Sequence, residues 1–370
     1  MKSHINSRRG RRLVALGAAV TVAGIAGAGQ ASASESAPND RVSTATSASL
    51  APVQLPGMRS AQTYSEAQAR AYDKTGGDPR VLAYWTPARM KAAKPLDAPG
   101  DAAAIDKAVK SATEKLLPAA STAPASSKIA GVAAKTPPVT NFSITNGKLF
   151  IGGYGSNSWC SASAINTATK RVVITAGHCV HGGKGGTWKS NLVFVPGYNA
   201  YAADPAPVGM FQAYRLRTFT AWINYGARTL TSASLPGFQR DVGFVTTYNG
   251  GDWNAPVVNT VGGHGLSYNG GYAWDVSLFG YPGNRNSGNV MWACWGSTAK
   301  DNWAYRTRIR GCGFGGGSSG GPWLWQYSNQ SGLGYVRTVM STYNATTNVN
   351  AGPYFDTAVY NALQATNGDW

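Results

Sequence analysis

The chain has 370 residues, of which 43% are hydrophobic and 46 are glycines, and its formal net charge is +17. This length accommodates one large or two medium domains with a sizeable core, and the many glycines and aromatics favour short strands joined by tight turns. The positive charge forms no basic run and no basic–aromatic stripe, so the composition does not support nucleic-acid binding.

The N-terminus has the layout of an export signal. Four arginines between residues 8 and 12 precede an uncharged run, LVALGAAVTVAGIAGAGQ, which leads into the triplet Ala31-Ser32-Ala33. This order is typical of a secretory signal peptide, and we predict residues 1–33 as the signal, with cleavage after Ala33. A membrane-anchoring helix is the alternative, but the run is short and rich in Gly and Ala. We therefore expect a secreted, extracellular protein without a stable membrane anchor.

Residues 34–140 form a leader of different composition. This stretch is rich in Ala, Ser, Thr and Pro, and it contains no cysteine and one tryptophan. Two patches predict helices, SEAQARAYD at 65–73 and DAAAIDKAVKSATEKLL at 101–117, where Asp101 is a candidate N-cap. We expect a partly helical, loosely structured segment. Composition leaves open whether it is a linker, a cell-wall tether or a removable pro-segment.

From residue 141 the chain predicts an all-β domain. Short apolar or alternating runs are separated by Gly, Asn and Pro, and they include KLFIGGY, RVVITAG, NLVFVPG, DVGFVTTY, VSLFGYPG and YVRTVMSTY. Regularly spaced short strands with turn signals between them are typical of a β-sandwich or a β-barrel. Residues 141–370 are therefore predicted as one compact β domain.

The chain has four cysteines, an even number that favours disulfides in an exported protein. Three connectivities are possible. We favour neighbour pairing, Cys160 with Cys179 and Cys294 with Cys312, because it closes two short loops. A zinc site is the alternative, but no C-x-x-C spacing is present.

Three motifs of the β domain suit one chemistry. His178 follows the apolar run RVVITAG, where a histidine fixed at a strand end can serve as a general base. Asp241 precedes the run VGFV and is placed to orient an imidazole. The stretch GCGFGGGSSGGPWL carries Ser318 and Ser319 among glycines whose N–H groups can approach a substrate closely. Taken singly, these motifs also fit a surface histidine, a turn aspartate and a flexible loop.

Together the motifs resemble the chymotrypsin/trypsin-like serine peptidase family, in its bacterial secreted type. The histidine motif is intact as TAGHC at 175–179, and the serine motif appears as GSSGGP at 317–322. The order His, Asp, Ser along the chain also fits. The resemblance covers roughly residues 141–370 and implies two six-stranded antiparallel β-barrels with the active site in the cleft between them.

The resemblance also implies roles for individual residues. His178 matches the general base, Asp241 its orienting acid, and Ser319, directly before Gly-Gly-Pro, the nucleophile. The backbone N–H groups of Gly317 and Ser319 match the oxyanion hole. The segment Ser341-Thr342-Tyr343 matches the strand that pairs with the substrate backbone. The family's bridge beside the histidine matches Cys160–Cys179, and a second bridge near the specificity region resembles Cys294–Cys312.

The sequence departs from the family pattern at two positions. Ser318 stands where the family has an aspartate that pairs with a freed N-terminus, so activation by that route is not expected. Gly313 stands where a trypsin has the aspartate of its substrate-binding pocket, so cleavage after Lys or Arg is not supported, although Asp356 lies in a later pocket-lining segment. His264 precedes Ser319 and does not match an acid-binding histidine. His181 is expected to be a solvent-exposed loop residue.

The combined prediction is a secreted serine endopeptidase, made as a pre-pro-protein, that acts on polypeptides through an acyl-enzyme. We expect a monomer that uses no cofactor and no metal. The alternative from another class is a catalytically inactive peptidase-like domain for binding or adhesion. An esterase with the same acyl chemistry fits the order of the motifs less well.

Overall fold

The structure is a computed structural model of the chain, and it describes residues 42–46, 64–96, 100–101, 116–125, 139–153 and 157–369. All of these belong to one compact unit, Pro38–Trp370. The predicted signal peptide, residues 1–33, lies outside the described residues. Within them, no helix is long and apolar enough to cross a membrane.

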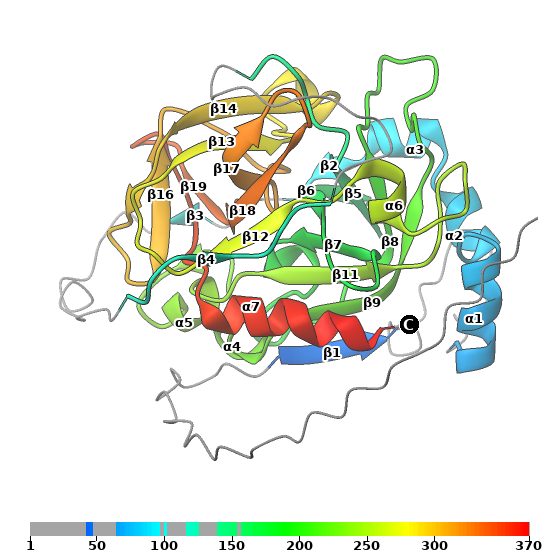
Figure 1. The fold of residues 1–370 in the computed structure, drawn as a ribbon, viewed down its shortest axis with the longest axis horizontal. Helices are drawn as coiled ribbons and strands as arrows, with labels where there is room; N and C mark the ends of the chain where they lie inside the picture. Colours follow the sequence, from blue (N-terminus) through cyan, green and yellow to red (C-terminus); the bar gives the residue numbers. More distant parts are fainter. Residues whose placement is uncertain are drawn as a thin grey trace, which may run out of the picture. The chain divides into compact units, whose positions relative to one another are not determined.

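The first barrel is closed by six antiparallel strands in the order β9, β11, β7, β6, β5 and β8, and β8 pairs back with β9 (Figure 1). These strands are β5 (Asn146–Gly152), β6 (Ser158–Ile165), β7 (Val172–Thr175), β8 (Ser190–Pro196), β9 (Phe211–Phe219) and β11 (Gly243–Thr247). Strand β7, with the sequence VVIT, is buried along its whole length, a position that β-branched residues favour. The leader strand β1 (Val42–Thr46) adds antiparallel to β9.

A second ring of six strands follows in the chain. It consists of β13 (Asp275–Gly280), β14 (Trp292–Ser297), β16 (Arg306–Arg310), β17 (Pro322–Ser328), β18 (Leu333–Val339) and β20 (Val349–Pro353). β13 pairs antiparallel with β14 and β17, β17 pairs with β18, and β16 pairs with β20. β14 contacts β16 and β18 contacts β20, which completes the ring. The predicted two-barrel fold is thus confirmed.

Shorter strands border the second barrel. They are β3 (Gly100–Asp101), β4 (Ala120–Ser121), β10 (Thr229–Leu230), β12 (Gly265–Tyr268), β15 (Ala299–Lys300) and β19 (Thr342–Asn344). β12 pairs in parallel with β18 and antiparallel with β4. The two barrels share one buried apolar cluster, which includes Leu149 and Phe194 from the first barrel and Phe279 and Val339 from the second. Residues near this junction are therefore held by both barrels.

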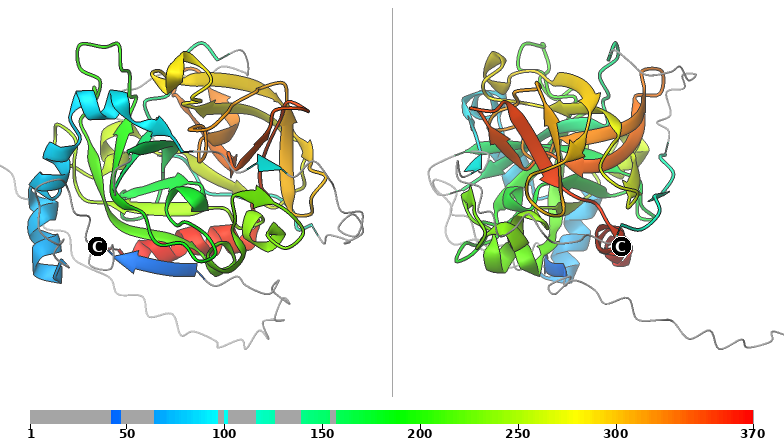
Figure 2. Two further views of the ribbon diagram at one scale, coloured as in Figure 1. Left: turned by 180° about the vertical axis from the view of Figure 1, so that it is seen from behind. Right: turned by 90° about the vertical axis from the view of Figure 1, so that its left-hand side faces the viewer.

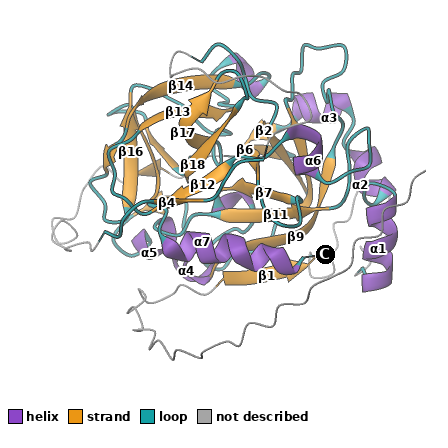
Figure 3. Cartoon of the chain, viewed as in Figure 1, coloured by secondary structure: helices purple, strands orange, loops and turns teal. Residues whose placement is uncertain are grey.

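The helices lie outside the barrels (Figure 3). Within the β domain they are α4 (Thr220–Tyr225), α5 (Leu235–Phe238), α6 (Val257–Val261) and α7 (Thr357–Gln364). Asp356 begins α7, because its side chain accepts hydrogen bonds from the backbone N–H groups of Ala358 and Val359. Beyond α7, the buried carboxylate of Asp369 pairs with Arg215 and Arg217 of β9 and so fixes the C-terminal segment.

In the described part of the leader, the helices are α1 (Glu66–Lys74), α2 (Pro79–Tyr84) and α3 (Pro87–Ala92), and the strand β2 (Lys94–Pro95) follows them. The patch predicted at 65–73 is confirmed, and Ser65 and Gln68 form a capping box at its start. The patch predicted at 101–117 lies mostly outside the described residues; Gly100–Asp101 is a strand and Leu116 and Leu117 are not helical.

Part of the leader is more ordered than its composition suggests. Trp85 is 2% exposed and packs on Phe150 of the first barrel, and Val81 and Met90 belong to the same buried cluster. The helices run along the first barrel in both views of Figure 2. Residues 64–96 therefore share a core with the β domain, whereas the Ala-, Ser-, Thr- and Pro-rich composition of the leader as a whole predicts a loose segment.

Candidate active site

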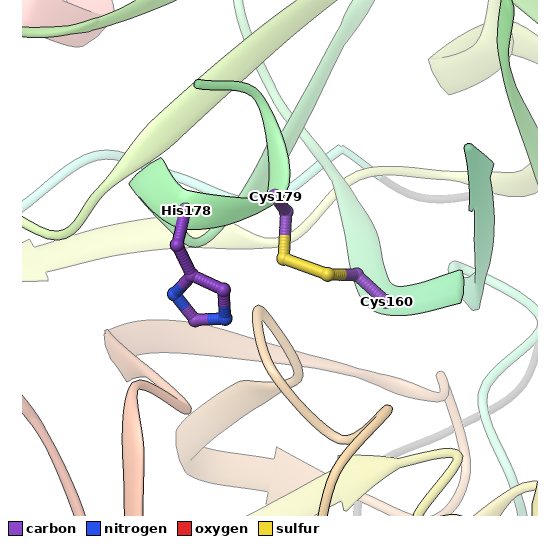
Figure 4. Close-up of side chains that lie close together, drawn as sticks. All are labelled: Cys160, His178 and Cys179. Carbon is purple, nitrogen blue, oxygen red and sulfur yellow. A yellow bond between two sulfur atoms is a disulfide. The ribbon is translucent and has the colours of Figure 1, made fainter. Parts of the chain in front are cut away.

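His178 lies in a single helical turn, Gly177–Cys179, that directly follows β7. The neighbouring Cys179 forms a disulfide with Cys160 of β6, and Figure 4 shows the imidazole projecting beside this bridge. The side chain of His178 is 7% exposed. The turn is therefore fixed to the adjacent strand, and the two sulfurs are used in the bridge rather than as metal ligands.

Asp241 orients the imidazole of His178. Its Oδ2 lies 2.9 Å from His178 Nδ1, and its Oδ1 accepts a hydrogen bond of 2.8 Å from the backbone N–H of His178. Ser341 Oγ donates a further hydrogen bond of 2.7 Å to Oδ2. A carboxylate in this position favours the tautomer with the proton on Nδ1, which leaves Nε2 free to accept a proton.

Ser319 is placed against the same part of the first barrel. Its carbonyl oxygen accepts a 2.7 Å hydrogen bond from Ser161 N–H and lies 3.8 Å from Cys179 Sγ. The next residue, Gly320, has φ +80°, and a Cβ there would lie 2.0 Å from Thr175 Oγ1, so only glycine allows this approach. Among the described residues, neither Ser319 Oγ nor His178 Nε2 has a hydrogen-bond partner, and both atoms are buried.

The loop before Ser319 is held rigidly. Gly317 has φ +84°, and a Cβ there would lie 2.3 Å from Trp159 Nε1. Ser161 Oγ donates to the Gly317 carbonyl, and Ser318 Oγ donates to the Gly315 carbonyl at 2.6 Å. The Ser318 hydroxyl therefore stabilises the loop through this hydrogen bond. The Gly317 N–H donates to a leader residue, the Leu96 carbonyl, at 2.9 Å.

The predicted substrate-binding residues are Gly313 and the segment Ser341-Thr342-Tyr343. Ser341 contacts Asp241, while Thr342 and Tyr343 belong to β19, which pairs antiparallel with β20. A Cβ at Gly313 would meet Asn348 Oδ1 at 3.0 Å, Arg285 Nη2 at 3.6 Å and the Tyr343 hydroxyl at 3.7 Å. This neighbourhood carries a cation and neutral polar groups, which gives no support for a Lys or Arg preference.

Asp356 does not change this conclusion. Its carboxylate caps α7 and forms an ion pair with Arg240 at 2.9 Å. Both carboxylate oxygens therefore have structural partners, Oδ1 in the helix cap and Oδ2 in the ion pair.

The other two histidines of the β domain have structural surroundings. The prediction that His181 is solvent-exposed is wrong: it is 5% exposed, packs on Trp188, and its Nδ1 accepts a hydrogen bond from Gly183 N–H. Its loop folds back onto the barrel, which the run HGGKGG does not reveal. His264 is fully buried between Asn146 and Gly334, and burial lowers its pKa to about 3.

The structure pairs Cys160 with Cys179 and Cys294 with Cys312, as predicted. One structural role in the site was not predicted, that of the Ser161 hydroxyl, which donates to Gly317 and accepts from Tyr281 N–H. The only sequence signal for this residue is its position next to Cys160. The hydrogen bond from Ser341 to Asp241 was not predicted either, because the resemblance implies only substrate binding for Ser341.

The two disulfides provide a matched pair of variants, since their sequence separations are 19 and 18 residues. Replacing either pair by alanines is expected to lower the free energy of unfolding by about 3 kcal/mol, measured by urea denaturation. Cys160→Ala with Cys179→Ala is also expected to lower kcat, by up to about a hundredfold, because the His178 turn loses its fixed position. Equal effects of the two pairs on kcat would contradict this role of the first bridge.

No protein-family model and no curated protein matches the chain, whereas solved structures do. A thermostable serine protease, AL20, from an extremophilic microorganism is 28% identical with a TM-score of 0.53, and the match covers 62% of this chain and 99% of that chain. Protease Anisep from Arthrobacter nicotinovorans is 29% identical with a TM-score of 0.51, covering 64% of this chain and 100% of that chain. The chain therefore has the fold of known serine proteases.

Proposed function

We propose that the chain is a serine endopeptidase that cleaves polypeptides with His178, Asp241 and Ser319. The observation that carries this proposal is the pairing of His178 Nδ1 with Asp241, which leaves His178 Nε2 unprotonated. His178 Nε2 and Ser319 Oγ are both buried, and neither has a hydrogen-bond partner among the described residues. A hydroxyl becomes a competent nucleophile when such a base takes its proton. The likeness to two serine proteases supports the same reaction.

In the proposed reaction, Ser319 Oγ attacks the carbonyl carbon of a peptide bond while its proton passes to His178 Nε2. The N–H groups of Gly317 and Ser319 stabilise the oxyanion of the tetrahedral intermediate. Protonated His178 then donates this proton to the leaving amine, and an acyl-enzyme ester remains. Water, deprotonated by His178, attacks the ester and releases the acid and Ser319.

The biological setting belongs to the same proposal. Residues 1–33 are the signal peptide of a secreted protein, residues 34–140 are a pro-segment, and residues 141–370 are the peptidase domain, which acts as a monomer. Two disulfides suit an oxidising extracellular destination. The complete His–Asp–Ser set favours catalysis over the alternative, an inactive domain for binding or adhesion.

An organophosphonate serine probe tests the proposal, because it labels only an activated hydroxyl. The purified chain, before and after limited proteolysis of the leader, is expected to gain one label, which peptide mass spectrometry assigns to Ser319. The variant Ser318→Ala is the matched control and should still be labelled, since the Ser318 hydroxyl is bonded to Gly315. A label on another residue, or undiminished labelling of Ser319→Ala, would refute the proposed nucleophile.

A further inference from the structure

Two short leader strands pair with strands that contribute to the candidate active site or flank it. β2 pairs in parallel with β6, with Lys94 N–H donating to the Asn157 carbonyl and Leu96 N–H to the Trp159 carbonyl, both at 2.9 Å. β3 lies between β19 and β10 and pairs in parallel with both: Gly100 is opposite Tyr343 and Thr229 (Figure 1). The leader therefore adds a strand to an edge of the first barrel and then to the sheet that contains β19.

Between these two strands the leader reaches the oxyanion loop. The Leu96 carbonyl accepts the N–H of Gly317 at 2.9 Å. This is the donor to which the proposed mechanism assigns the developing oxyanion, and a substrate carbonyl must displace Leu96 to use it. The pairing of β3 with β19 occupies the segment assigned to the substrate backbone in the same way. One leader segment thus competes with substrate at two places.

The preceding helices hold this segment in place. Trp85 Nε1 donates to the Asn191 carbonyl at 2.8 Å, and the Tyr84 hydroxyl donates to Asn157 Oδ1 at 2.8 Å. Arg171 of the first barrel forms an ion pair with Asp73 of α1 at 2.6 Å. Together with the burial of Trp85, these contacts give the attached strand a high effective concentration at the site.

We propose that two pieces of the leader, residues 94–96 and residues 100–101, act as an internal inhibitor that occupies the candidate active site of this chain; the proposal rests on the proposed function for its catalytic consequence. The segment is held without being cut. Leu96 has the Gly317 N–H as donor, but no hydrogen bond among the described residues joins its carbonyl to Ser319 N–H or Ser319 Oγ. Its carbonyl therefore lacks the second donor that attack requires. Cleavage of the chain after residue 101 alone leaves the inhibitor bound through α1–α3.

Two substitutions in the full chain release the inhibitor in different ways. Leu96→Pro removes the N–H that donates to Trp159, and Trp85→Ala removes the anchor of the helices. We expect Ser319 to react with the phosphonate probe about tenfold faster in Leu96→Pro and about a hundredfold faster in Trp85→Ala than in the unmodified chain. Lys91→Ala, an exposed change in α3, is the matched control and should react at the unmodified rate.

Hydrogen exchange measures occupancy without any reaction. In the Ser319→Ala chain, the Gly317 amide should be protected, and adding Leu96→Pro should speed its exchange at least tenfold while Lys91→Ala leaves it unchanged. If the Gly317 amide exchanges at the same rate in all three chains, the proposal of an internal inhibitor is refuted, whatever the labelling shows. If no chain is labelled but Leu96→Pro still removes the protection of the Gly317 amide, the proposed function is refuted. The proposal that the leader occupies the site then stands. A Ser319-dependent cut after Leu96, seen by mass spectrometry, shows a substrate instead.

Discussion

Ser319→Ala is expected to lower kcat/KM for a peptide substrate by about a million-fold, with KM nearly unchanged. The methyl group of alanine cannot form the acyl-enzyme, while the Gly317 and Ser319 N–H groups still stabilise an oxyanion. The fold should tolerate the change, because Ser319 Oγ makes no hydrogen bond to any described residue. Steady-state hydrolysis of a chromogenic peptide by the released enzyme measures the loss.

Two further variants distinguish a lost nucleophile from a damaged site. Ser318→Ala removes a hydroxyl of the same loop, whose bond to the Gly315 carbonyl is structural, and should cost far less than Ser319→Ala. Combining Ser319→Ala with His178→Ala should cost little more than either alone, because the two side chains act as one unit. Additive losses in the double variant would argue against a shared proton transfer between them.

Much of the fold could be predicted where strands are apolar. The runs around β5, β7, β8, β11, β13 and β18 are rich in Val, Ile, Leu and Phe, and each forms a strand. The sequences SWCSASAI of β6 and RTRIR of β16 contain small polar or charged residues and give no such signal. They become strands because their neighbours pair with them on one or both sides, an effect of tertiary context.

For the candidate site, the sequence predicted the candidate catalytic side chains but not the contacts that the leader makes with the site. Its three chemical groups stand in short motifs, and the structure brings His178 and Asp241 into contact. The contact of Leu96 with Gly317 was not predictable, since residues more than 200 positions apart meet through backbone atoms that carry no side-chain signal. The packing of Trp85 on Phe150 was not predictable for a similar reason, because a single tryptophan in a leader rich in Ala, Ser, Thr and Pro does not indicate its partner.

Asp241→Asn is expected to lower kcat by about ten thousand-fold at neutral pH. The free energy of unfolding should change by much less than the activation free energy that this loss of kcat represents. The carboxylate is fully buried and accepts from His178 Nδ1–H, His178 N–H and Ser341 Oγ. An amide can present an N–H to Nδ1, which moves the ring proton to Nε2 and removes the base that Ser319 needs. The pH–rate profile of the released enzyme and urea denaturation measure the two effects.

Ser341→Ala tests how much of the effect comes from holding the Asp241 carboxylate in position rather than from its negative charge. This variant removes one of the three donors but keeps the carboxylate on Nδ1, so kcat should fall by only about tenfold. The large difference between the two variants would show that the tautomer, rather than the packing around Asp241, sets the activity. If Asp241→Asn instead retained activity within tenfold of Ser341→Ala, another group would have to orient His178. The structure offers none, because no described residue besides Asp241 is bonded to its ring.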